Sequence, residues 1–576
     1  MTKRVRIKRR IDLAAGRDTL ELVLKNCKII NVFSHEIIEG DIGIDSGKII
    51  GIGHYKGHEE IDMNGRYIAP GLIDSHEHLE SAMVTPAQMS RVVVPRGTTT
   101  IIADPHEIAN VCGIKGIEFM MDSVKESPLN VFFMLPSCVP ATPFETSGAK
   151  LLAEDLEELM SRKNVLGLGE MMDFPGVIEG RDDIIDKMML AQYKIIDGHG
   201  PIIEGNDLNA YIINGIKTDH ECDSLSDMKA RLDRGMYIAI REGSAARNLK
   251  ALIQGVTLSN SRRCTLCTDD KNPEDILREG HIDFSIRKAI ELGIDPITAI
   301  QMATINTAEC YYLRDIGAIA PGYDADLIVI DDLKAFNVKE VYKKGIMVAK
   351  DGKALFDVKE TEIDDVVETV NIKPVALDDL RIHLDSDIVN VISVLPFSLV
   401  TERNIRKVHI NKDGFFEKHK HIDIVKLAVI ERHNATGNIG LGLVENFKIK
   451  NGAIASTIGH DSHNLIVIGD NDEDMLKAIN AVEALEGGIA VVQNGHVEAL
   501  QLRIAGLMSD QPMEFVASRL KELLKIARES LGVNNKIDPF MTLSFLALPV
   551  IPDIKLTDKG LFDVLKFDFM DIEVKE

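Results

Sequence analysis

Short apolar runs recur along residues 71–268, and each is followed by a polar loop and an amphipathic stretch. The runs contain β-branched residues and have the length of buried strands. Strands that alternate with helices predict parallel βαβ units, and about eight units in ~250 residues fit a (β/α)8 barrel. The alternative, an open doubly wound sheet, calls for a glycine-rich phosphate loop that the sequence lacks. The expected strands are 71–75, 98–104, 130–136, 164–170, 194–198, 215–219, 236–240 and 264–268, and the expected helices are 112–126, 150–162, 181–193, 224–234 and 274–292.

Strand-and-turn patterns flank this central region. Residues 20–65 contain LELVLKNCKIINV and DIGIDSGKIIGIG, with Ser46-Gly47 as a hairpin turn, and a similar texture returns at 318–353. These two segments predict one small β-sandwich into which the barrel is inserted; two unrelated β patches are the alternative. Beyond residue 377 strands and helices mix, which predicts an α+β domain. The predicted domains are 1–70 with 316–370, 71–315, and 377–576.

The overall charge limits the classes of partner. The 576 residues carry a formal net charge of −24, which argues against nucleic acid or an anionic membrane as the main partner. Seven cysteines, none of them after Cys310, predict reduced thiols and a cytoplasmic protein. The sequence has no apolar run of about 18 residues, so no transmembrane helix is expected. The basic first residues lack the apolar segment of a secretory signal and predict a surface helix, with a transit peptide as the alternative.

Histidines and carboxylates follow almost every expected strand. His76 and His78 end the first strand two residues apart, so both point to the same face. Catalytic groups of a parallel barrel lie at the carboxyl ends of its strands. One such residue alone is as often a solvated loop residue, but convergence of this many is not expected by chance. The later strand ends carry Asp104, His106, Glu170, His199, Asp219, His220, Glu221, Arg241, Glu242, Asp269 and Asp270.

These residue types predict a site for two divalent metal ions. Four histidines and two carboxylates exceed what one ion needs, whereas one carboxylate shared by two ions fits the count. Such a pair lowers the pKa of a shared water toward ~7 and directs hydroxide at an electrophilic carbon. Ligands without thiolate suit Mn²⁺ or Fe²⁺, with Zn²⁺ as the alternative. The assigned ligands are His76, His78 and Asp269 for one ion and His199 and His220 for the other, with Glu170 between the two.

The order of these residues resembles the amidohydrolase superfamily, in which His-x-His, a shared carboxylate, two histidines and an aspartate lie over a barrel beside a split β-sandwich. Longer motifs resemble the adenine deaminase family within it and extend over nearly the whole chain. Where many relatives in the superfamily have a carboxylated lysine, this family has a glutamate, which Glu170 matches. The motifs are APGLIDSHEHLESAMVTP, RGTTTIIADPHEIANVCG, LGLGEMMDFPGV, DGHGP, DLNAYIINGIKTDHEC and LCTDD, followed by VIERHNATGNIGLGLV and IASTIGHDSHNLIVIGDND.

The resemblance implies hydrolysis of adenine to hypoxanthine and ammonia in purine salvage, with adenine and a second copy of the chain as partners. Hydroxide attacks C6, N1 takes a proton, and the exocyclic amine leaves. Asp104 and Glu170 are the candidate acid–base groups, and His106 is expected to orient a ligand, contact substrate or act as an extra ligand. Four further residues are expected around the ligands and the substrate: Glu221 and Asp270, which could hold imidazoles by hydrogen bonds, and Glu242 and His463.

Other interpretations stay open. A related amidohydrolase acting on another nucleobase, cyclic amide or amidine would need the same metal ligands. A non-catalytic scaffold with this fold would have lost some of these ligands, whereas all six candidate positions are occupied here. Cys264-x-x-Cys267 and His78-x-Glu80 resemble the halves of a thiolate-zinc deaminase signature, but no proline precedes Cys264, so chance is favoured. Beyond the barrel, Arg432-His433 and His460-Asp461-Ser462-His463 form a second polar cluster. This cluster could enclose substrate or bind a further cation. The alternative is a loop whose hydrogen bonds support a domain interface, and the residues alone favour this alternative.

Overall fold

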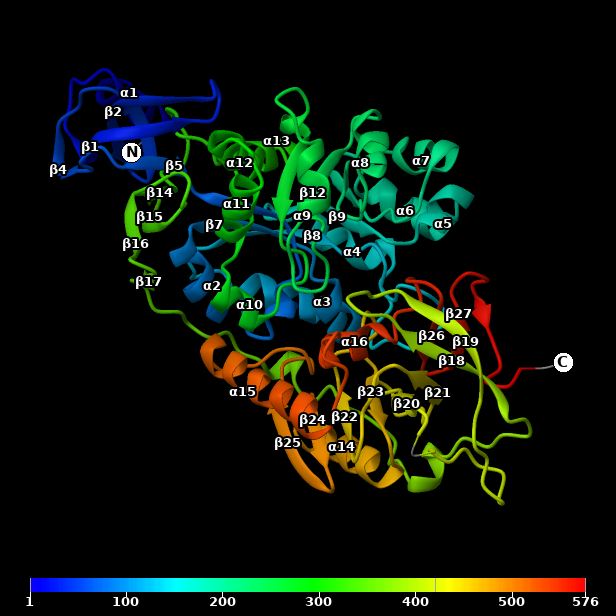
Figure 1. The fold of residues 1–576 in the computed structure, drawn as a ribbon. Helices are drawn as coiled ribbons and strands as arrows, with labels where there is room; N and C mark the ends of the chain where they lie inside the picture. Colours follow the sequence, from blue (N-terminus) through cyan, green and yellow to red (C-terminus); the bar gives the residue numbers. More distant parts are fainter. Residues whose placement is uncertain (1, 420, 575–576) are drawn as a thin grey trace.

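The structure is a computed structural model that describes residues 2–419 and 421–574. Three parts follow one another along the chain (Figure 1): an amino-terminal β-sheet, a barrel of parallel strands, and a carboxyl-terminal α+β part packed against the barrel. The predicted fold class is therefore confirmed, while the domain boundaries stay predictions. Helix α1 (Lys3–Ala14) is mostly exposed before the first strand. Every helix in the described residues is too short or too polar to serve as a membrane span.

In the described part of the chain, eight parallel strands make the barrel. Strands β6 to β10 pair in order in one sheet and β11 to β13 in another. Single bridges between Ile196 and Ile216 and between Glu77 and Asp269 join the two sheets into a ring. The strands are buried on both faces, which explains their nearly continuous apolar sequences. They are β6 (Leu72–Glu77), β7 (Thr98–Ala103), β8 (Asn130–Leu135), β9 (Val165–Met171), β10 (Ile195–Gly198), β11 (Thr218–Asp219), β12 (Tyr237–Arg241) and β13 (Cys264–Cys267).

The helices around the barrel differ from the prediction in two places. Helix α3 (His106–Asp122) begins at His106 instead of residue 112 and is interrupted at Gly113, which has a φ of 59°. The helix expected at 274–292 is two helices, α10 (Pro273–Arg278) and α11 (Ile282–Glu291), because Gly280 between them takes a φ of 120°. The others are α2 (Pro86–Val93), α4 (Ala153–Met160), α5 (Phe174–Glu179), α6 (Asp182–Leu190), α7 (Gly205–Ile212), α8 (Leu225–Leu232), α9 (Leu249–Leu252), α12 (Pro296–Met302) and α13 (Ile305–Cys310).

The amino-terminal strands and those after the barrel belong to one sheet. Strand β5 (Tyr67–Pro70) pairs with β14 (Leu327–Ile330) where the chain enters the barrel. The predicted small β-sandwich is built from one hydrogen-bonded sheet that branches at β1 (Leu20–Asn31), because this long strand pairs with β4 at its start and with β5 at its end. The predicted turn at Ser46 and Gly47 has φ values of 52° and 74°. The remaining strands are β2 (Glu36–Asp45), β3 (Lys48–Ile52), β4 (Gly57–Asp62), β15 (Val338–Lys343), β16 (Ile346–Lys350) and β17 (Lys353–Ala354).

The carboxyl-terminal part packs a mixed sheet and its helices against the barrel (Figure 1). The amide of Asn464 donates to the carbonyl of Thr146, and the hydroxyl of Thr146 donates to Asp558 at 2.7 Å. The loop after β8 is thereby fixed to this part of the chain. Its elements are β18 (Ile388–Val394), β19 (Thr401–Lys407), β20 (Ile424–Ile430), β21 (Ile439–Glu445), β22 (Gly452–Ser456), β23 (Leu465–Gly469), α14 (Asp472–Ala484), β24 (Gly488–Gln493), β25 (His496–Gln501), α15 (Met513–Lys525), α16 (Pro539–Phe545), β26 (Ile554–Thr557), β27 (Gly560–Asp563) and β28 (Asp568–Phe569).

Candidate metal centre

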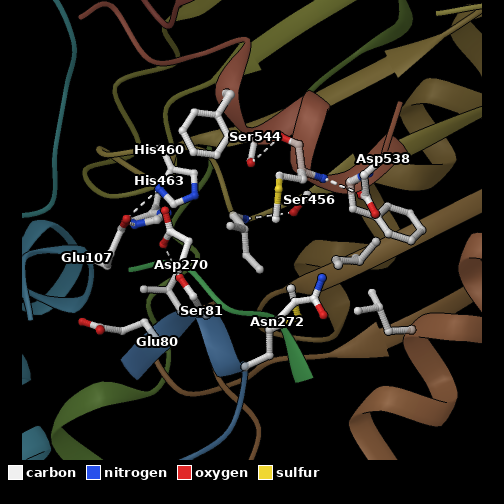
Figure 2. Close-up of a pocket in the computed structure, with 18 of the residues that line it drawn as sticks. Glu80, Ser81, Glu107, Asp270, Asn272, Ser456, His460, His463, Asp538 and Ser544 are labelled. Atoms are coloured by element: carbon white, nitrogen blue, oxygen red, sulfur yellow. Dashed lines mark hydrogen bonds and ion pairs between the residues drawn. The ribbon is translucent and has the colours of Figure 1, made fainter. Parts of the chain in front are cut away.

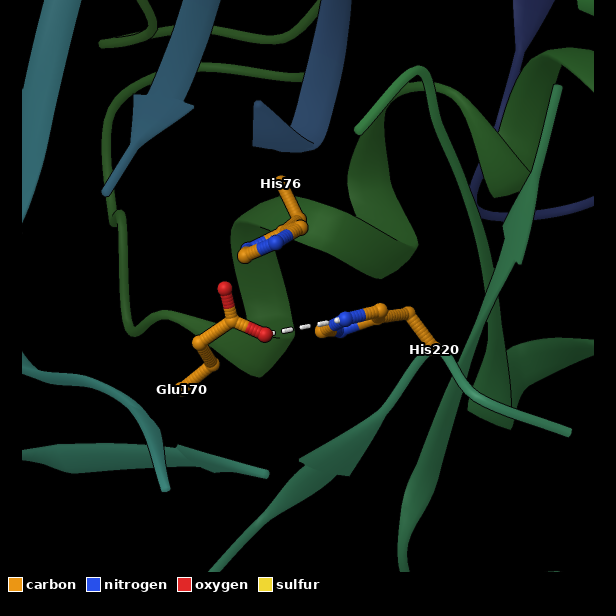
Figure 3. Close-up of side chains that lie close together, drawn as sticks. All are labelled: His76, Glu170 and His220. Atoms are coloured by element: carbon orange, nitrogen blue, oxygen red, sulfur yellow. Dashed lines mark ion pairs between the residues drawn. The ribbon is translucent and has the colours of Figure 1, made fainter. Parts of the chain in front are cut away.

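Histidines and carboxylates from five barrel strands meet at the carboxyl ends of the strands. Figure 3 shows the rings of His76 and His220 beside the carboxylate of Glu170. These two rings are nearly parallel, at 17°, and their centroids are 4.3 Å apart. The structure thus brings strands β6 and β11 together although their histidines are far apart in the sequence. The six predicted ligands in this cluster are His76, His78, Glu170, His199, His220 and Asp269.

Glu170 at the end of β9 lies between two groups of imidazoles. Its Oε1 is 3.2 Å from Nε2 of His78 and 3.5 Å from Nδ1 of His106. Its Oε2 is 2.7 Å from Nδ1 of His199 and 3.1 Å from Nε2 of His220. One carboxylate oxygen therefore faces each group, which is the arrangement that a carboxylate shared by two cations needs.

Asp269 after β13 completes the group that contains the first-strand histidines. Its Oδ1 is 3.1 Å from Nε2 of His78 and 3.4 Å from Nε2 of His76. Its Oδ2 accepts a hydrogen bond from Arg241 at 2.7 Å. Asp269 has a φ of 59°, a left-handed conformation that costs free energy for a residue with a β-carbon. Backbone hydrogen bonds with β6 hold it there: its N–H donates to His76 and its carbonyl accepts from His78.

Backbone contacts fix the orientation of His78 and Glu170. Nδ1–H of His78 donates to the carbonyl of Asp104 at 3.0 Å, so the lone pair of Nε2 faces the cluster. The side chain of Asp104 accepts the N–H of Glu170 at 2.9 Å. This contact requires glycine at 169, because a β-carbon there would lie 2.0 Å from Oδ2 of Asp104. Asp104 thus positions both residues from outside the cluster.

The groups perturb one another's pKa values in opposite directions. Burial alone would lower the pKa of His78, but Asp269 and Glu170 raise it well above its usual value. The same competition raises the pKa of His220, where Glu170 and Glu221 outweigh burial. Burial alone would raise the pKa of Glu170, but the imidazoles around it lower it well below its usual value. The carboxylates are therefore ionised and attract positive charge to this point.

The donor set fits a pair of divalent cations. Among the described residues Nε2 of His76 has no hydrogen-bond partner although it is buried, and burial followed by the nearby His220 lowers its pKa. A neutral imidazole with a free lone pair is the form that binds a metal ion. Imidazole and carboxylate ligands suit Mn²⁺, Fe²⁺ and Zn²⁺. His76, His78 and Asp269 could hold one ion and His199 and His220 the other.

The remaining predicted residues do not all belong to this cluster. Oε1 of Glu221 lies 3.3 Å from Nε2 of His220 and 3.6 Å from Nδ1 of His199, close enough to be a ligand itself. Asp270 accepts a hydrogen bond from the hydroxyl of Ser81, and within the described residues it forms none with a ligand imidazole. His463 contacts Glu107 on the side of the carboxyl-terminal part.

Glu242 is not at the site. It is fully buried and faces outward, where Lys288 and Arg247 bind its carboxylate. Arg241, one residue earlier on β12, faces inward instead and bridges Glu221 and Asp269 at 2.6 and 2.7 Å. Arg241 was predicted to lie at a strand end, but no function was predicted for it. Neighbouring residues of a strand point to opposite faces, so the two cannot both line the site.

Glu107 was given no role from the sequence, whereas His460 was placed in the second polar cluster. Nδ1 of His460 lies 2.6 Å from Oε1 of Glu107, in a contact between α3 and the carboxyl-terminal part. The pairing spans more than 350 residues, so the sequence pattern alone could not indicate it. Cys264 and Cys267, by contrast, are buried strand residues, and burial raises the pKa of Cys264 to about 12. This agrees with their interpretation as packing residues.

A cavity of about 430 Å³ opens over the cluster. Its floor contains Glu170 and His220, whereas Asp104 does not line it. Residues 397–400 and 548–552 of the carboxyl-terminal part form the opposite wall, together with His460 and Asp461. The volume falls in the range of small-molecule sites. The cavity therefore offers a metal-type cluster on one side and largely apolar side chains on the other.

Comparison with known proteins gives matches along the whole chain. Residues 67–348 match the amidohydrolase family and residues 398–568 match the adenine deaminase C-terminal domain. The chain is 55% identical to the adenine deaminase of Clostridium acetobutylicum over 568 residues, which cover 98% of this chain and 100% of that protein. It is 48% identical to the adenine deaminase of Nitratidesulfovibrio vulgaris over 577 residues, which cover both chains completely. A solved enamidase structure of the amidohydrolase superfamily is 18% identical, with a TM-score of 0.44, and the match covers 59% of this chain and 98% of that one.

Proposed function

The chain belongs to the adenine deaminase family, and we propose that it hydrolyses adenine to hypoxanthine and ammonia. The observation that carries this proposal is the position of Glu170, which turns one carboxylate oxygen toward each half of a cluster of imidazoles. A cavity of about 430 Å³ lies directly over that carboxylate. Family membership supplies the substrate, and the geometry supplies the means of hydrolysis.

Six residues are proposed to hold the metal pair. When bound, two divalent ions act as Lewis acids and provide hydroxide at neutral pH. Glu221 is a further candidate ligand on the second side, because its oxygen approaches both His199 and His220. Arg241 keeps Glu221 and Asp269 in place and offsets their negative charge. The six residues are His76, His78 and Asp269 on one side, His199 and His220 on the other, and Glu170 shared.

The protein's own groups must move protons during the reaction. An oxygen–C6 bond forms, the bond from C6 to the exocyclic nitrogen breaks, and protons reach N1 and the leaving ammonia. Glu170 is the proposed proton carrier because it lines the cavity and contacts the cluster. Asp104 is proposed to act through Glu170, whose N–H it accepts, since it lies behind the cavity wall. His106 lies 3.5 Å from Glu170 and lines the cavity, which suits contact with substrate or ligand orientation.

The finer assignments complete the proposal. Mn²⁺ or Fe²⁺ is proposed for the pair, with Zn²⁺ as the alternative, because the ligands are imidazoles and carboxylates without thiolate. A role in purine salvage in the cytoplasm is proposed, supported by seven cysteines that are all free thiols in the described chain. A homodimer with adenine as its small-molecule partner is proposed from the resemblance to the family. The acidic net charge of −24 argues against nucleic acid and anionic membranes as partners.

Purified protein reconstituted with Mn²⁺ and mixed with adenine tests the proposal. We expect ammonia and hypoxanthine in equal amounts, and much slower release of ammonia from guanine, cytosine and adenosine. His220→Asn is the matched negative control, because it keeps a polar side chain that is too short to reach the position of Nε2. Protein that binds its metal pair but releases ammonia from another base, and none from adenine, would favour a related amidohydrolase instead.

A further inference from the structure

A second group of buried histidines and carboxylates lies beside the metal centre, where the first turn of α3 meets residues 459–464. We call it the interdomain cluster. Each member is more than nine-tenths buried. Figure 2 shows Glu107, His460 and His463 turned toward one another, with Asp270 close by. The members are His106, Glu107, His460, Asp461 and His463.

Two carboxylate oxygens and two ring nitrogens of the interdomain cluster lie within 4 Å of one another in four oxygen–nitrogen pairs. Oε1 of Glu107 is 2.6 Å from Nδ1 of His460 and 3.5 Å from Nε2 of His106. Oδ1 of Asp461 is 3.8 Å from Nε2 of His106 and 3.9 Å from Nδ1 of His460. Tetrahedral coordination with bonds of about 2.1 Å places ligand atoms roughly 3.4 Å apart. The four separations bracket that value, so a single ion fits between these atoms after small side-chain movements.

One carboxylate oxygen of the cluster has no partner. Within the described residues, Oδ2 of Asp461 has no hydrogen-bond partner although it is buried, whereas Oε2 of Glu107 faces Nε2 of His463. Buried carboxylates in proteins are normally hydrogen-bonded, paired with a cation or bound to metal. Asp270 and Glu80 line the same small cavity as Glu107 and His460. A cation bound between Glu107 and Asp461 would compensate the buried negative charge of these two carboxylates.

Two neighbours position the candidate ligands. Nδ1 of His463 accepts the N–H of Gly459 at 3.3 Å, so a neutral ring carries its proton on Nε2, which faces Glu107. A histidine that donates to a ligand carboxylate fixes its orientation in known metal sites. The ring of Phe545 packs on the ring of His460 with centroids 4.4 Å apart. The cluster therefore has supporting contacts around its candidate ligands.

We propose that the interdomain cluster binds a third divalent transition-metal ion through His106, Glu107, His460 and Asp461, with His463 as the positioning residue. Two imidazoles and two carboxylates suit Mn²⁺, Fe²⁺ or Zn²⁺ better than Ca²⁺ or Mg²⁺. The ion joins α3 to the carboxyl-terminal part at the edge of the substrate cavity, which His460 and Asp461 line. His106 links the two sites, because its Nδ1 lies 3.5 Å from Glu170.

Metal stoichiometry of the full-length protein tests this proposal independently of deamination. Reconstitution of the wild type with Mn²⁺ should give three ions per chain, and the double variant His460→Gln with Asp461→Asn should give two. His433→Gln is the matched control, because His433 donates to the carbonyl of Ser462 at 2.7 Å in the same region without facing the cluster. It should retain three ions. A double variant that binds as many ions as the wild type would overturn the proposal.

Anomalous diffraction at the manganese edge locates the ion even if the double variant does not fold. Crystals of the wild type should show a peak between Glu107 and His460, separate from the peaks at Glu170. The variant Glu170→Gln should lose signal in the barrel and keep the peak at the interdomain cluster. Failure of the metal-pair proposal is therefore distinguishable from failure of this one. Two ions per chain and no anomalous peak at the interdomain cluster would overturn the proposal of a third ion. The cluster would then be a set of hydrogen bonds that joins α3 to the carboxyl-terminal part.

Discussion

Replacing Glu170 by glutamine keeps the shape of the side chain and removes its charge. In the wild type both carboxylate oxygens face imidazoles, at 3.2 Å for His78 and 3.1 Å for His220. Glutamine has one carbonyl oxygen, and its amide nitrogen has no lone pair to offer a metal ion. The variant can therefore coordinate an ion on one side of the cluster but not on both sides. We expect it to fold, to lose at least one ion of the barrel pair, and to lose deamination.

The size of the effect follows from Coulomb's law. At a separation of about 3 Å, a carboxylate and a divalent ion attract each other by about 11 kcal/mol at an effective dielectric constant of 20. If the amide dipole and rearranged water recover three quarters of this, about 3 kcal/mol is still lost. On the side of the cluster that faces the amide nitrogen of glutamine, that loss lowers the affinity for the metal ion by roughly 100-fold. Turnover should fall by at least the same factor, because the shared carboxylate is also the proposed proton carrier.

Metal analysis and initial rates on the same samples provide the assay. Wild type and variant are dialysed against graded free Mn²⁺, and bound ions and hypoxanthine formation are measured at each concentration. Glu242→Gln is the matched control: it makes the same substitution at a buried strand end of the same barrel, but this carboxylate faces Lys288 and Arg247. The control should retain the wild-type ions per folded chain. A Glu170→Gln protein with unchanged ion affinity and turnover within tenfold of wild type would refute the reasoning.

Three further predictions test the surroundings of the site. Gly169→Ala places a β-carbon 2.0 Å from Oδ2 of Asp104, so it should displace the contact with Glu170 and lower metal affinity or kcat by about 10–100-fold, measured by dialysis and initial rates. Metal binding to the free protein at pH 7 should release about two to three protons, because the pKa values of three proposed ligands, His78, His199 and His220, are raised. Affinity should therefore rise with pH, and calorimetry in buffers of different ionisation enthalpy would contradict this if it detected no released protons. Burial lowers the pKa of Lys555 to about 7 from 10.5, so the stability associated with neutral Lys555 is complete above pH 10.5 and is lost as pH falls toward 7. Lys555→Met should therefore stabilise the protein at pH 7 by roughly 2–3 kcal/mol and flatten this pH dependence, seen as a higher melting temperature.

The barrel and the clustering of histidines and carboxylates at its carboxyl end could be predicted because parallel strands have a local signature. Each strand is buried on both faces, so its sequence is an apolar run, and the residues that follow the run lie at one end of the barrel. His199 and His220 needed no long-range information once their strands were identified. Glu242 was misplaced although the rule that excludes it is equally local. Since Arg241 points into the barrel, the next residue must point out.

The ends of the helices and the contacts between the barrel and the carboxyl-terminal part could not be predicted from local sequence patterns. The apolar pattern predicts a helix from residue 112, but a further helical segment that begins at His106 precedes it. Gly113, with a φ of 59°, interrupts α3 between the two segments, so the periodicity of the second segment carries no information about the first. The contact of Glu107 with His460 depends on how two separately folded parts pack. Local periodicity carries no information about that packing.

The two sides of the cavity have different tasks in binding a neutral base. The carboxylates and imidazoles of the barrel attract cations, but adenine has no net charge and gains little from their field. Its two flat faces need apolar contact, and stacking on aromatic or apolar groups contributes about 1–3 kcal/mol per base. Such side chains come from beyond the barrel: Phe397, Leu399, Leu548 and Ile551 line the wall opposite Glu170. Phe397 is 86% exposed, which is unusual for a phenylalanine and leaves its ring free to cover a bound base. We therefore expect the barrel to provide the chemistry at the edge of the ring and the carboxyl-terminal part to provide the surfaces that contact its faces.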